Sequence, residues 1–183
     1  MHGQMYEIQL NLNIMRRFLS IALLALCAAF TVTSCETMDP DKDFSGTIYG
    51  FWVVDKLVVD ASLTINGTTT SNTTTTDFTK EYCRLNLDTS HIATLWFNLK
   101  FDSELFSYDE SKQRIEFKEA LDLDGNGKAI TILGIYDVKL EGDNLVLKQP
   151  EASIGIGGYG ASEQATYYFH RAPKSEKPKE TNQ

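Results

Sequence analysis

The sequence predicts an all-β protein, and three observations on residues 47–171 support this. Valine, isoleucine, threonine and aromatic residues recur in short runs with the period-two alternation of half-buried strands. Turn residues separate these runs, and no run of ten or more residues has the pattern and caps of an amphipathic helix. Eight to ten short strands in one chain indicate a sandwich or a barrel. A barrel is preferred, because closure removes exposed strand edges.

The first strands are expected between residues 48 and 88. Residues 48–61 form a long strand in which Gly50 permits a bend. Asn66-Gly67 lies between threonine- and isoleucine-rich flanks, which is a strong signal for a two-residue hairpin turn. Residues 72–88 then continue as one or two strands.

The middle of the chain is expected to supply the barrel interior. Residues 91–102 alternate as one strand, and residues 105–120 are typical of a strand, a turn and a second strand. Side chains at every second position share one face of a strand, so the bulky residues of that face are large enough to fill a small barrel. These residues are Leu95, Phe97, Leu99, Phe101, Ile115 and Phe117.

The last third continues the β pattern. Residues 128–149 predict two strands around a turn at Gly142-Asp143-Asn144, and residues 165–172 predict a final strand. The glycine-rich residues 153–164 are expected to form a mobile loop over a barrel mouth; the alternative is a long hairpin loop without a role. Residues 172–183 are charged and contain proline, which indicates a disordered tail.

The start of the chain has the layout of a secretory signal. Arg16 and Arg17 precede an apolar run, Phe18 to Phe30, and small residues follow it. The run has 13 residues, whereas a membrane-spanning helix needs about 20. Residues 1–14 do not fit a signal, so Met15 is a better start than Met1.

Cys35 ends a second motif. Val32-Thr33-Ser34-Cys35 resembles the lipobox of bacterial lipoproteins, which implies that the Cys35 thiol receives a diacylglyceryl group and that an acyl chain such as palmitate follows after cleavage. Several acyl chains on one residue give the stable membrane anchor that a single chain does not give. An ordinary signal-peptidase site nearby is the alternative.

The segment behind Cys35 is polar and acidic up to about residue 46. It resembles the export signals that send some Gram-negative lipoproteins to the outer cell face; a plain solvated spacer is the alternative. The expected organisation is an upstream extension with a signal peptide, an acidic tether, a β-barrel domain and a tail, with boundaries at 1–34, 35–46, 47–171 and 172–183. The expected location is the outer membrane, with the domain lipid-anchored and facing either the periplasm or the cell surface.

Composition limits the partners. Removal of residues 1–34 leaves 149 of the 183 residues, enough for one domain with its own core. The removed part has a net charge of +1, so the formal charge changes from −8 to −9, which argues against nucleic acid as a partner. Cys27 leaves with the signal and Cys35 is lipidated. Only Cys83 remains, and a lone cysteine in a strand-like run is more often a small buried apolar residue than a nucleophile.

A family resemblance rests on both ends of the expected barrel. Gly50-Phe51-Trp52 is a Gly-x-Trp motif on the first strand, and Arg171 ends the last strand. Together they resemble the lipocalins, in which glycine allows a bend, tryptophan closes one end, and a basic residue packs over that tryptophan. The resemblance is to short lipocalin-like bacterial lipoproteins and covers residues 47–171. It implies an antiparallel up-and-down barrel of about eight strands.

One motif invites a metal hypothesis. Asp122, Asp124 and Asn126 have the spacing of the first, third and fifth ligands of an EF-hand loop, with Gly127 at the sixth position. The twelfth position is Leu133, where a glutamate is needed, and no helices flank the segment. A polar β-turn is the preferred interpretation. No metal or other cofactor is expected.

The expected function follows from the barrel. No Ser-His-Asp order and no paired-carboxylate motif is present, so an enzyme is not expected. Barrel mouths are common ligand sites, which favours binding of a small apolar or amphipathic ligand. The aromatic candidates for a lining are Trp96, Tyr136 and Tyr168. The alternative is a structural or interaction module, such as an accessory subunit of an outer-membrane complex, with a filled barrel.

Overall fold

The computed structural model describes residues 44–173 and residue 176. These residues belong to one compact unit, Pro40–Gln183. The predictions for the start codon, the signal segment, Cys35, the tether up to residue 43 and most of the tail lie outside the described residues. Within the described part of the chain, no helix has the length and apolar character needed to cross a membrane.

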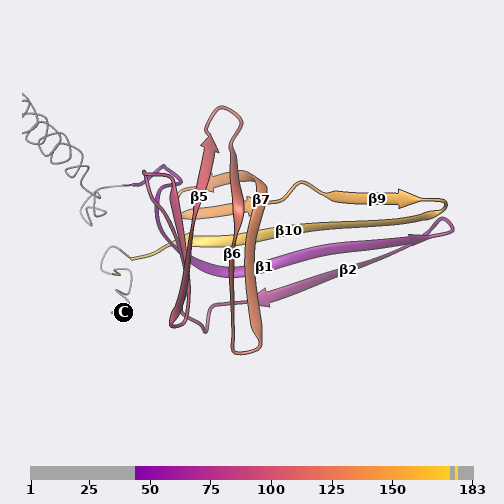
Figure 1. The fold of residues 1–183 in the computed structure, drawn as a ribbon, viewed down its shortest axis with the longest axis horizontal. Coiled ribbons are helices and arrows are strands. Elements are labelled where there is room, and N and C mark those ends of the chain that lie inside the picture. Colours follow the sequence, from indigo (N-terminus) through magenta and orange to yellow (C-terminus); the bar gives the residue numbers. More distant parts are fainter. Residues whose placement is uncertain (1–43, 174–175, 177–183) are drawn as a thin grey trace, which may run out of the picture. The chain divides into compact units, whose positions relative to one another are not determined.

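The described residues form one antiparallel sheet that closes on itself (Figure 1). Eight strands make the barrel in the order β1-β3-β4-β5-β6-β7-β8-β10, and β10 pairs back with β1. This confirms the prediction of an all-β, antiparallel up-and-down barrel of about eight strands, and the barrel is compatible with a lipocalin-like fold. The strands are β1 (Gly50–Ile65), β2 (Thr68–Asp77), β3 (Cys83–Leu87), β4 (Ile92–Phe97), β5 (Lys100–Asp109), β6 (Arg114–Gly125), β7 (Lys128–Glu141), β8 (Asn144–Lys148), β9 (Ala152–Ile156) and β10 (Tyr159–Arg171).

Strands β1 and β10 are longer than the barrel. Strand β1 pairs with β3 only over Gly50–Val53, whereas Lys56–Ile65 pairs with β2. Strand β10 pairs with β8 near its end and with β9 near its start, while β1 and β10 stay paired throughout. Four strands, β2-β1-β10-β9, therefore continue past the barrel as a distal extension, which Figure 1 shows running away from β5 and β7.

The prediction of a single strand over residues 91–102 is wrong. Asn98 and Leu99 form a two-residue turn between β4 and β5, in which Phe97 pairs with Lys100. Asn98 has a φ of +58°, which asparagine tolerates better than most residues. The turn breaks the alternation, so Leu99 is 84% exposed and Phe101 44% exposed, while Leu95 and Phe97 lie in the interior.

The expectation of a mobile loop over residues 153–164 is also wrong. The segment is the β9–β10 hairpin, with Gly157 and Gly158 at positive φ in its turn. Adjacent glycines supply the left-handed backbone that a tight hairpin turn requires. The segment is a hairpin of paired strands, as the alternative had it in shape, and the hairpin belongs to the distal extension.

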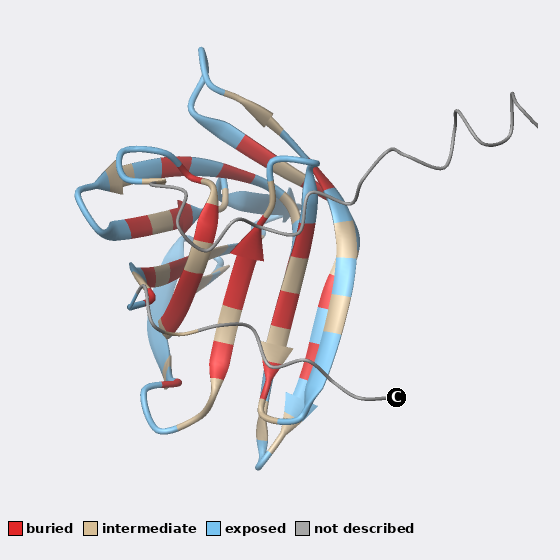
Figure 2. Cartoon of the chain, turned by 90° about the vertical axis from the view of Figure 1, so that its left-hand side faces the viewer, coloured by how far each residue is buried: buried red, intermediate tan, exposed pale blue. Residues whose placement is uncertain are grey.

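The barrel interior is filled with apolar side chains. Figure 2 shows buried residues alternating with less buried ones along the barrel strands, as expected when one face of each strand points inward. Ring contacts cross the interior in a continuous series, with centroids 5.9–6.4 Å apart between successive rings. The series runs through Tyr49, Phe106, Phe117, Tyr136, Tyr167 and Phe169.

Candidate functional site

One end of the barrel is closed by Trp52. Its indole is fully buried and donates a hydrogen bond from Nε1 to the carbonyl of Ile48, 2.8 Å away. The guanidinium carbon of Arg171 lies 4.1 Å from the Trp52 ring centroid, which is the contact that the lipocalin resemblance implies. Arg171 also donates from Nη1 to the carbonyl of Tyr49 and from Nη2 to that of Thr47. Arg171 therefore ties the chain entering β1 to the end of β10.

Gly50 makes this arrangement possible. Its φ is +120°, and an added Cβ would lie 2.7 Å from Arg171 Nη1. A side chain at residue 50 would therefore collide with the guanidinium. This close approach gives a physical reason for glycine in the Gly-x-Trp motif.

The opposite end of the barrel, from which the distal extension leaves, is closed by Phe78. This residue follows β2 and is fully buried. Its backbone N–H donates to the carbonyl of Asp55, 2.8 Å away, and its ring meets that of Phe97 edge-on at 5.8 Å. The lipocalin resemblance would place a ligand entrance at this end, because Trp52 closes the other. Phe78 occupies that place.

A cation holds the segment that carries Phe78. Lys128, at the start of β7, donates from Nζ to both carboxylate oxygens of Glu81 at 2.9 and 3.0 Å, and to the carbonyl of Asp77. The side chains of Glu81 and Lys128 are largely shielded from solvent. The pair therefore joins the β6–β7 hairpin to the segment between β2 and β3.

The β6–β7 hairpin also contributes to closure. An irregular register between Phe117 and Leu121, and a φ of +88° at Gly134, let the far part of the hairpin change direction. Its inward side chains join the same buried cluster as Phe78 and Phe97. They are Leu121, Leu123, Ile130 and Ile132.

The two tyrosine hydroxyls inside the barrel, those of Tyr136 and Tyr167, are hydrogen-bonded. The Tyr136 hydroxyl accepts hydrogen bonds from the backbone N–H of Leu133 and from Nε2 of Gln149, at 3.2 and 3.1 Å. The Tyr167 hydroxyl donates to the carbonyl of Thr131. Burial raises the pKa of Tyr136 to about 12 and also raises the pKa of Tyr167, so both hydroxyls stay protonated at neutral pH.

The three aromatic candidates for a ligand lining do not come together. Tyr136 lies inside the barrel and packs against other rings. Trp96 and Tyr168 alternate with inward-facing neighbours and lie on the outside. Lys56 Nζ lies 4.6 Å from the Tyr168 ring centroid, and the Trp96 ring meets Phe51 edge-on at 5.6 Å.

The outside of β4 and β5 carries an apolar surface, which we call the outer-wall patch. Trp96 pairs across the strands with Phe101, and Ile92 pairs with Leu105. Phe51 completes the patch by its edge-on contact with Trp96. Phe101, Ile92 and Leu105 are exposed. The residues were visible in the sequence, but the missed turn at Asn98 placed Phe101 on the wrong face.

A cation borders the outer-wall patch. Arg84 pairs with Trp96 across β3 and β4 and forms a 2.8 Å ion pair with Glu176. Its guanidinium carbon also lies 4.7 Å from the Tyr82 ring centroid. Ala172 is buried as well, so the described part of the expected tail contacts the barrel. Aromatic rings beside an arginine are typical of the residues that dominate protein interfaces.

The calcium candidates lie on a hairpin. Asp122 and Asp124 belong to β6, and Asn126-Gly127 is a two-residue turn with both φ values positive. The Asp122 carboxylate accepts from Thr131, and Asp124 pairs with Lys100 at 2.5 Å. In the part of the chain that the structure describes, no three His, Cys, Asp or Glu side chains are grouped to hold a metal ion. The polar-turn interpretation fits this geometry.

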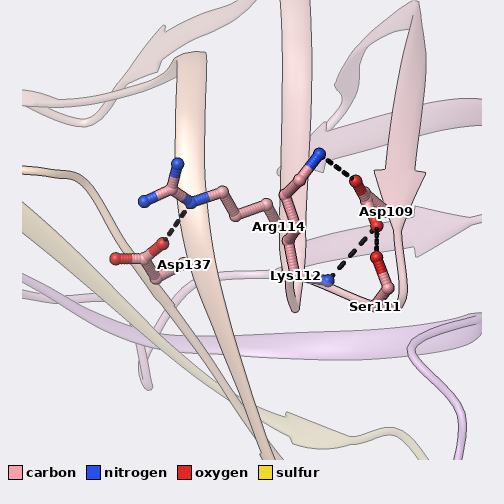
Figure 3. A network of polar contacts seen from close by, with 5 residues as sticks. All are labelled: Asp109, Ser111, Lys112, Arg114 and Asp137. Carbon is pink, nitrogen blue, oxygen red and sulfur yellow. Dashed lines mark hydrogen bonds and ion pairs between the residues drawn. The ribbon is translucent and has the colours of Figure 1, made fainter.

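Other titratable residues are also bound to neighbours. At the β5–β6 turn, Asp109 accepts from Ser111 and Lys112, while Arg114 pairs with Asp137 on β7 at 2.8 Å (Figure 3). The hydrogen bond from the Lys112 side chain, followed by that from Ser111, lowers the pKa of Asp109 to about 2. A carboxylate with so low a pKa is ionised at neutral pH and is poorly matched to proton transfer there.

The remaining candidates lie apart. His170 contacts Asp55 at 2.7 Å on the outside of the barrel, whereas His91 lies between the rings of Tyr49 and Phe106. Cys83 is fully buried, and desolvation raises its pKa to about 12. A thiol in this state is inert, because the thiolate is the nucleophile.

Comparisons of the chain with models of protein families, with curated proteins and with solved structures gave no match.

Proposed function

We propose that this protein is a lipid-anchored lipoprotein of the outer membrane whose lipocalin-like barrel serves as a non-enzymatic protein-interaction module. The observation that supports it most is the filled interior, closed by Trp52 at one end and by Phe78 at the other. A drug-sized ligand needs roughly 300 Å³ or more. Side chains in mutual contact occupy that space here.

The opening of this barrel would be costly. Entry past Phe78 requires exposure of a fully buried ring and loss of its contact with Phe97. It also requires separation of Lys128 from Glu81. Exposure of one large aromatic side chain alone costs about 2–3 kcal/mol. The architecture therefore favours a rigid scaffold over a container.

The outer-wall patch is the surface that we assign to the partner. Scattered exposed apolar residues are ordinary, but here two apolar cross-strand pairs, Trp96–Phe101 and Ile92–Leu105, lie on the outside of two adjacent strands, on either side of the hydroxyl pair Thr94–Ser103. Tryptophan and arginine are enriched among the residues that dominate binding energy, and Arg84 stands beside Trp96. The partner is therefore expected to be an envelope protein with a complementary apolar surface.

Native mass spectrometry of the full chain, isolated from its own envelope, tests this function. We expect a stoichiometric protein partner that is lost in Phe101→Ser/Leu105→Ser. The matched control is Leu133→Ser/Ile135→Ser, which removes two exposed apolar side chains from β7. Retention of the partner by the first double variant, or its loss from both, contradicts the assignment of the patch.

Ligand binding is the second candidate function, because the barrel is compatible with it and the Arg171–Trp52 contact resembles that of lipocalins. The same spectra separate the two functions. A co-purifying small apolar molecule, without a protein partner, supports the carrier and contradicts the module.

The anchor is tested separately. We expect palmitate supplied to the cells to label the protein and the label to disappear in Cys35→Ala, because the Cys35 thiol and the new amino terminus carry the acyl chains. Persistent labelling of the variant would refute lipidation at Cys35 without affecting the assignment of the outer-wall patch.

A further inference from the structure

The far end of the distal extension has an unusual composition. We call it the distal tip and define it as residues 61–70 and 152–162. It contains no Asp, Glu, Lys or Arg, although such residues are 23% of the chain. Its two hairpin turns are joined by a hydrogen bond from the Asn66 backbone N–H to the Gly158 carbonyl, 2.8 Å long. The tip is therefore an ordered, uncharged end of a sheet.

One face of the distal tip is apolar. Directly paired residues of antiparallel strands share a face. Ile65 pairs with Tyr159, which pairs with Ile156. In the next row, Leu63 pairs with Ala161, which pairs with Ile154. On β2 these two rows end in threonines, Thr68 opposite Ile65 and Thr70 opposite Leu63, so the apolar part of the face covers β1, β10 and β9. Ile154 and Ile156 are 76% and 83% exposed, and Leu63, Ile65 and Tyr159 are exposed as well.

The other face of the distal tip is polar, and its hydroxyls bond to one another. Ser62 and Ser162 are 2.9 Å apart across β1 and β10. Thr64 and Thr69 are 2.8 Å apart across β1 and β2. The removal of a hydroxyl from bulk water costs less free energy when the hydroxyl already has a hydrogen-bond partner within the protein. Transfer of the tip to a less polar environment is therefore favourable on one face and inexpensive on the other.

We propose that the distal tip inserts its apolar face into the interfacial layer of a lipid bilayer. The apolar residues occupy two rows, so they lie within about 10 Å of the turns. Amphipathic segments bury their apolar face about 5–10 Å into the boundary between headgroups and acyl chains. The first charged residues on β1 and β10, Asp60 and Glu163, lie about 16–20 Å along the strands from the turns, well beyond this depth.

The small apolar area of the distal tip favours a lipid bilayer over a second copy of the chain as the partner. The two apolar rows on three strands cover about 200 Å². A stable protein interface buries about 800 Å² on each partner. The patch is too small for a dimer, whereas a bilayer surrounds the side chains of the tip.

Two further features set the type of lipid and the depth. The chain has a formal charge of −8, so a zwitterionic surface is expected to bind better than an anionic one. Strands β2 and β9 are edges with unpaired backbone groups, which do not enter the hydrocarbon core. Insertion therefore stops in the hydrated interface.

Quenching by brominated lipid tests the proposal on the full chain. The probe is a phosphatidylcholine vesicle with or without bromine on the acyl chains. Tyr159→Trp places a reporter in the tip, and Leu99→Trp places a matched exposed reporter on the β4–β5 turn. Trp52 and Trp96 form a common background in both. We expect bromine to lower the emission added by Tyr159→Trp at least twofold and to leave that added by Leu99→Trp unchanged.

A second variant separates the tip from other contacts with lipid. Ile154→Ser/Ile156→Ser, introduced with Tyr159→Trp, should abolish the quenching and leave the circular dichroism unchanged, because both isoleucines are exposed. Equal quenching of both reporters, or quenching that survives the serine variant, overturns the proposal. Absence of quenching also overturns the proposal. If the chain then self-associates in sedimentation, and the serine variant does not, the tip binds a second copy of the chain instead. These outcomes do not depend on the outer-wall patch or on Cys35.

Discussion

Replacement of Gly50 by alanine is the sharpest perturbation of the closed barrel end. Gly50 has a φ of +120°, where residues other than glycine are strained. The new Cβ would lie 2.7 Å from Arg171 Nη1, closer than any real contact of this kind, so the guanidinium must move. Arg171 would then lose its position over Trp52 and its hydrogen bonds to the carbonyls of Thr47 and Tyr49.

The cost has two parts. Backbone strain at a sparsely populated φ contributes about 1–3 kcal/mol. Loss of a shielded cation–π contact contributes about 0.5–2 kcal/mol. We therefore expect Gly50→Ala to lower the free energy of unfolding by about 1.5–5 kcal/mol, measured by urea unfolding with circular dichroism and the fluorescence of Trp52 and Trp96.

A matched control separates strain from collision. Gly134 has a φ of +88°, and nothing lies within 4 Å of its added Cβ, so Gly134→Ala should show strain alone. Arg171→Met removes the guanidinium, and in that background the extra cost of Gly50→Ala over Gly134→Ala should shrink. If Gly50→Ala costs no more than Gly134→Ala in the unsubstituted chain, the reasoning about Arg171 is refuted.

Two further predictions concern the barrel interior. Lys128→Met should lower the free energy of unfolding by about 1–3 kcal/mol, because it leaves the Glu81 carboxylate shielded without its cation; unchanged urea unfolding and unchanged amide exchange at residues 77–82 would refute this role. Stability should also fall as the pH rises above about 9. Burial raises the pKa of Cys83 and of Tyr136 to about 12 and raises that of Tyr167, whereas the unfolded chain releases these protons near 9.0 and 10.0. The unfolded state thus binds fewer protons, and the free energy of unfolding is expected to be lower by roughly 5 kcal/mol at pH 11. A free energy of unfolding that stays constant between pH 8 and pH 11, measured by urea unfolding, would contradict this prediction.

Local signals in the sequence predicted the fold class and several turns. Asn66-Gly67 forms the expected hairpin turn, because both residues adopt positive φ at little cost. Gly142 also lies in a turn at positive φ, between β7 and β8. Period-two alternation identified strands whose inward side chains, such as Leu95 and Phe117, form the core. These features depend on few neighbours along the chain.

The errors arose where a local pattern was ambiguous. Residues 91–102 keep their apolar alternation through the Asn98 turn, so periodicity alone did not separate β4 from β5. The glycines of residues 153–164 suit a loop as well as a hairpin turn, and the pairing of β9 with β10 decided between them. A Gly-Gly pair between short alternating runs was the available signal.

Long-range pairing decided the candidate sites. The contact of Arg171 with Trp52 required closure of β10 on β1, which no local pattern encodes. The function of Phe78 as a plug depends on the crossing from β2 to β3 and on Lys128 from β7, fifty residues later in the sequence. The distal extension was not anticipated, because strand composition does not reveal how far a strand continues past its neighbours.

Binding of the fluorescent apolar probe N-phenyl-1-naphthylamine tests most directly whether the barrel is filled. The chain should carry Ile154→Ser/Ile156→Ser, so that the distal tip does not bind the probe. We expect no saturable rise in emission. Phe78→Ala in the same chain should give a saturable rise, because removal of the ring opens a cavity at a cost of about 3–5 kcal/mol, with circular dichroism confirming the fold. Saturable one-to-one binding before Phe78 is replaced would contradict the filled barrel and favour a carrier of apolar ligands.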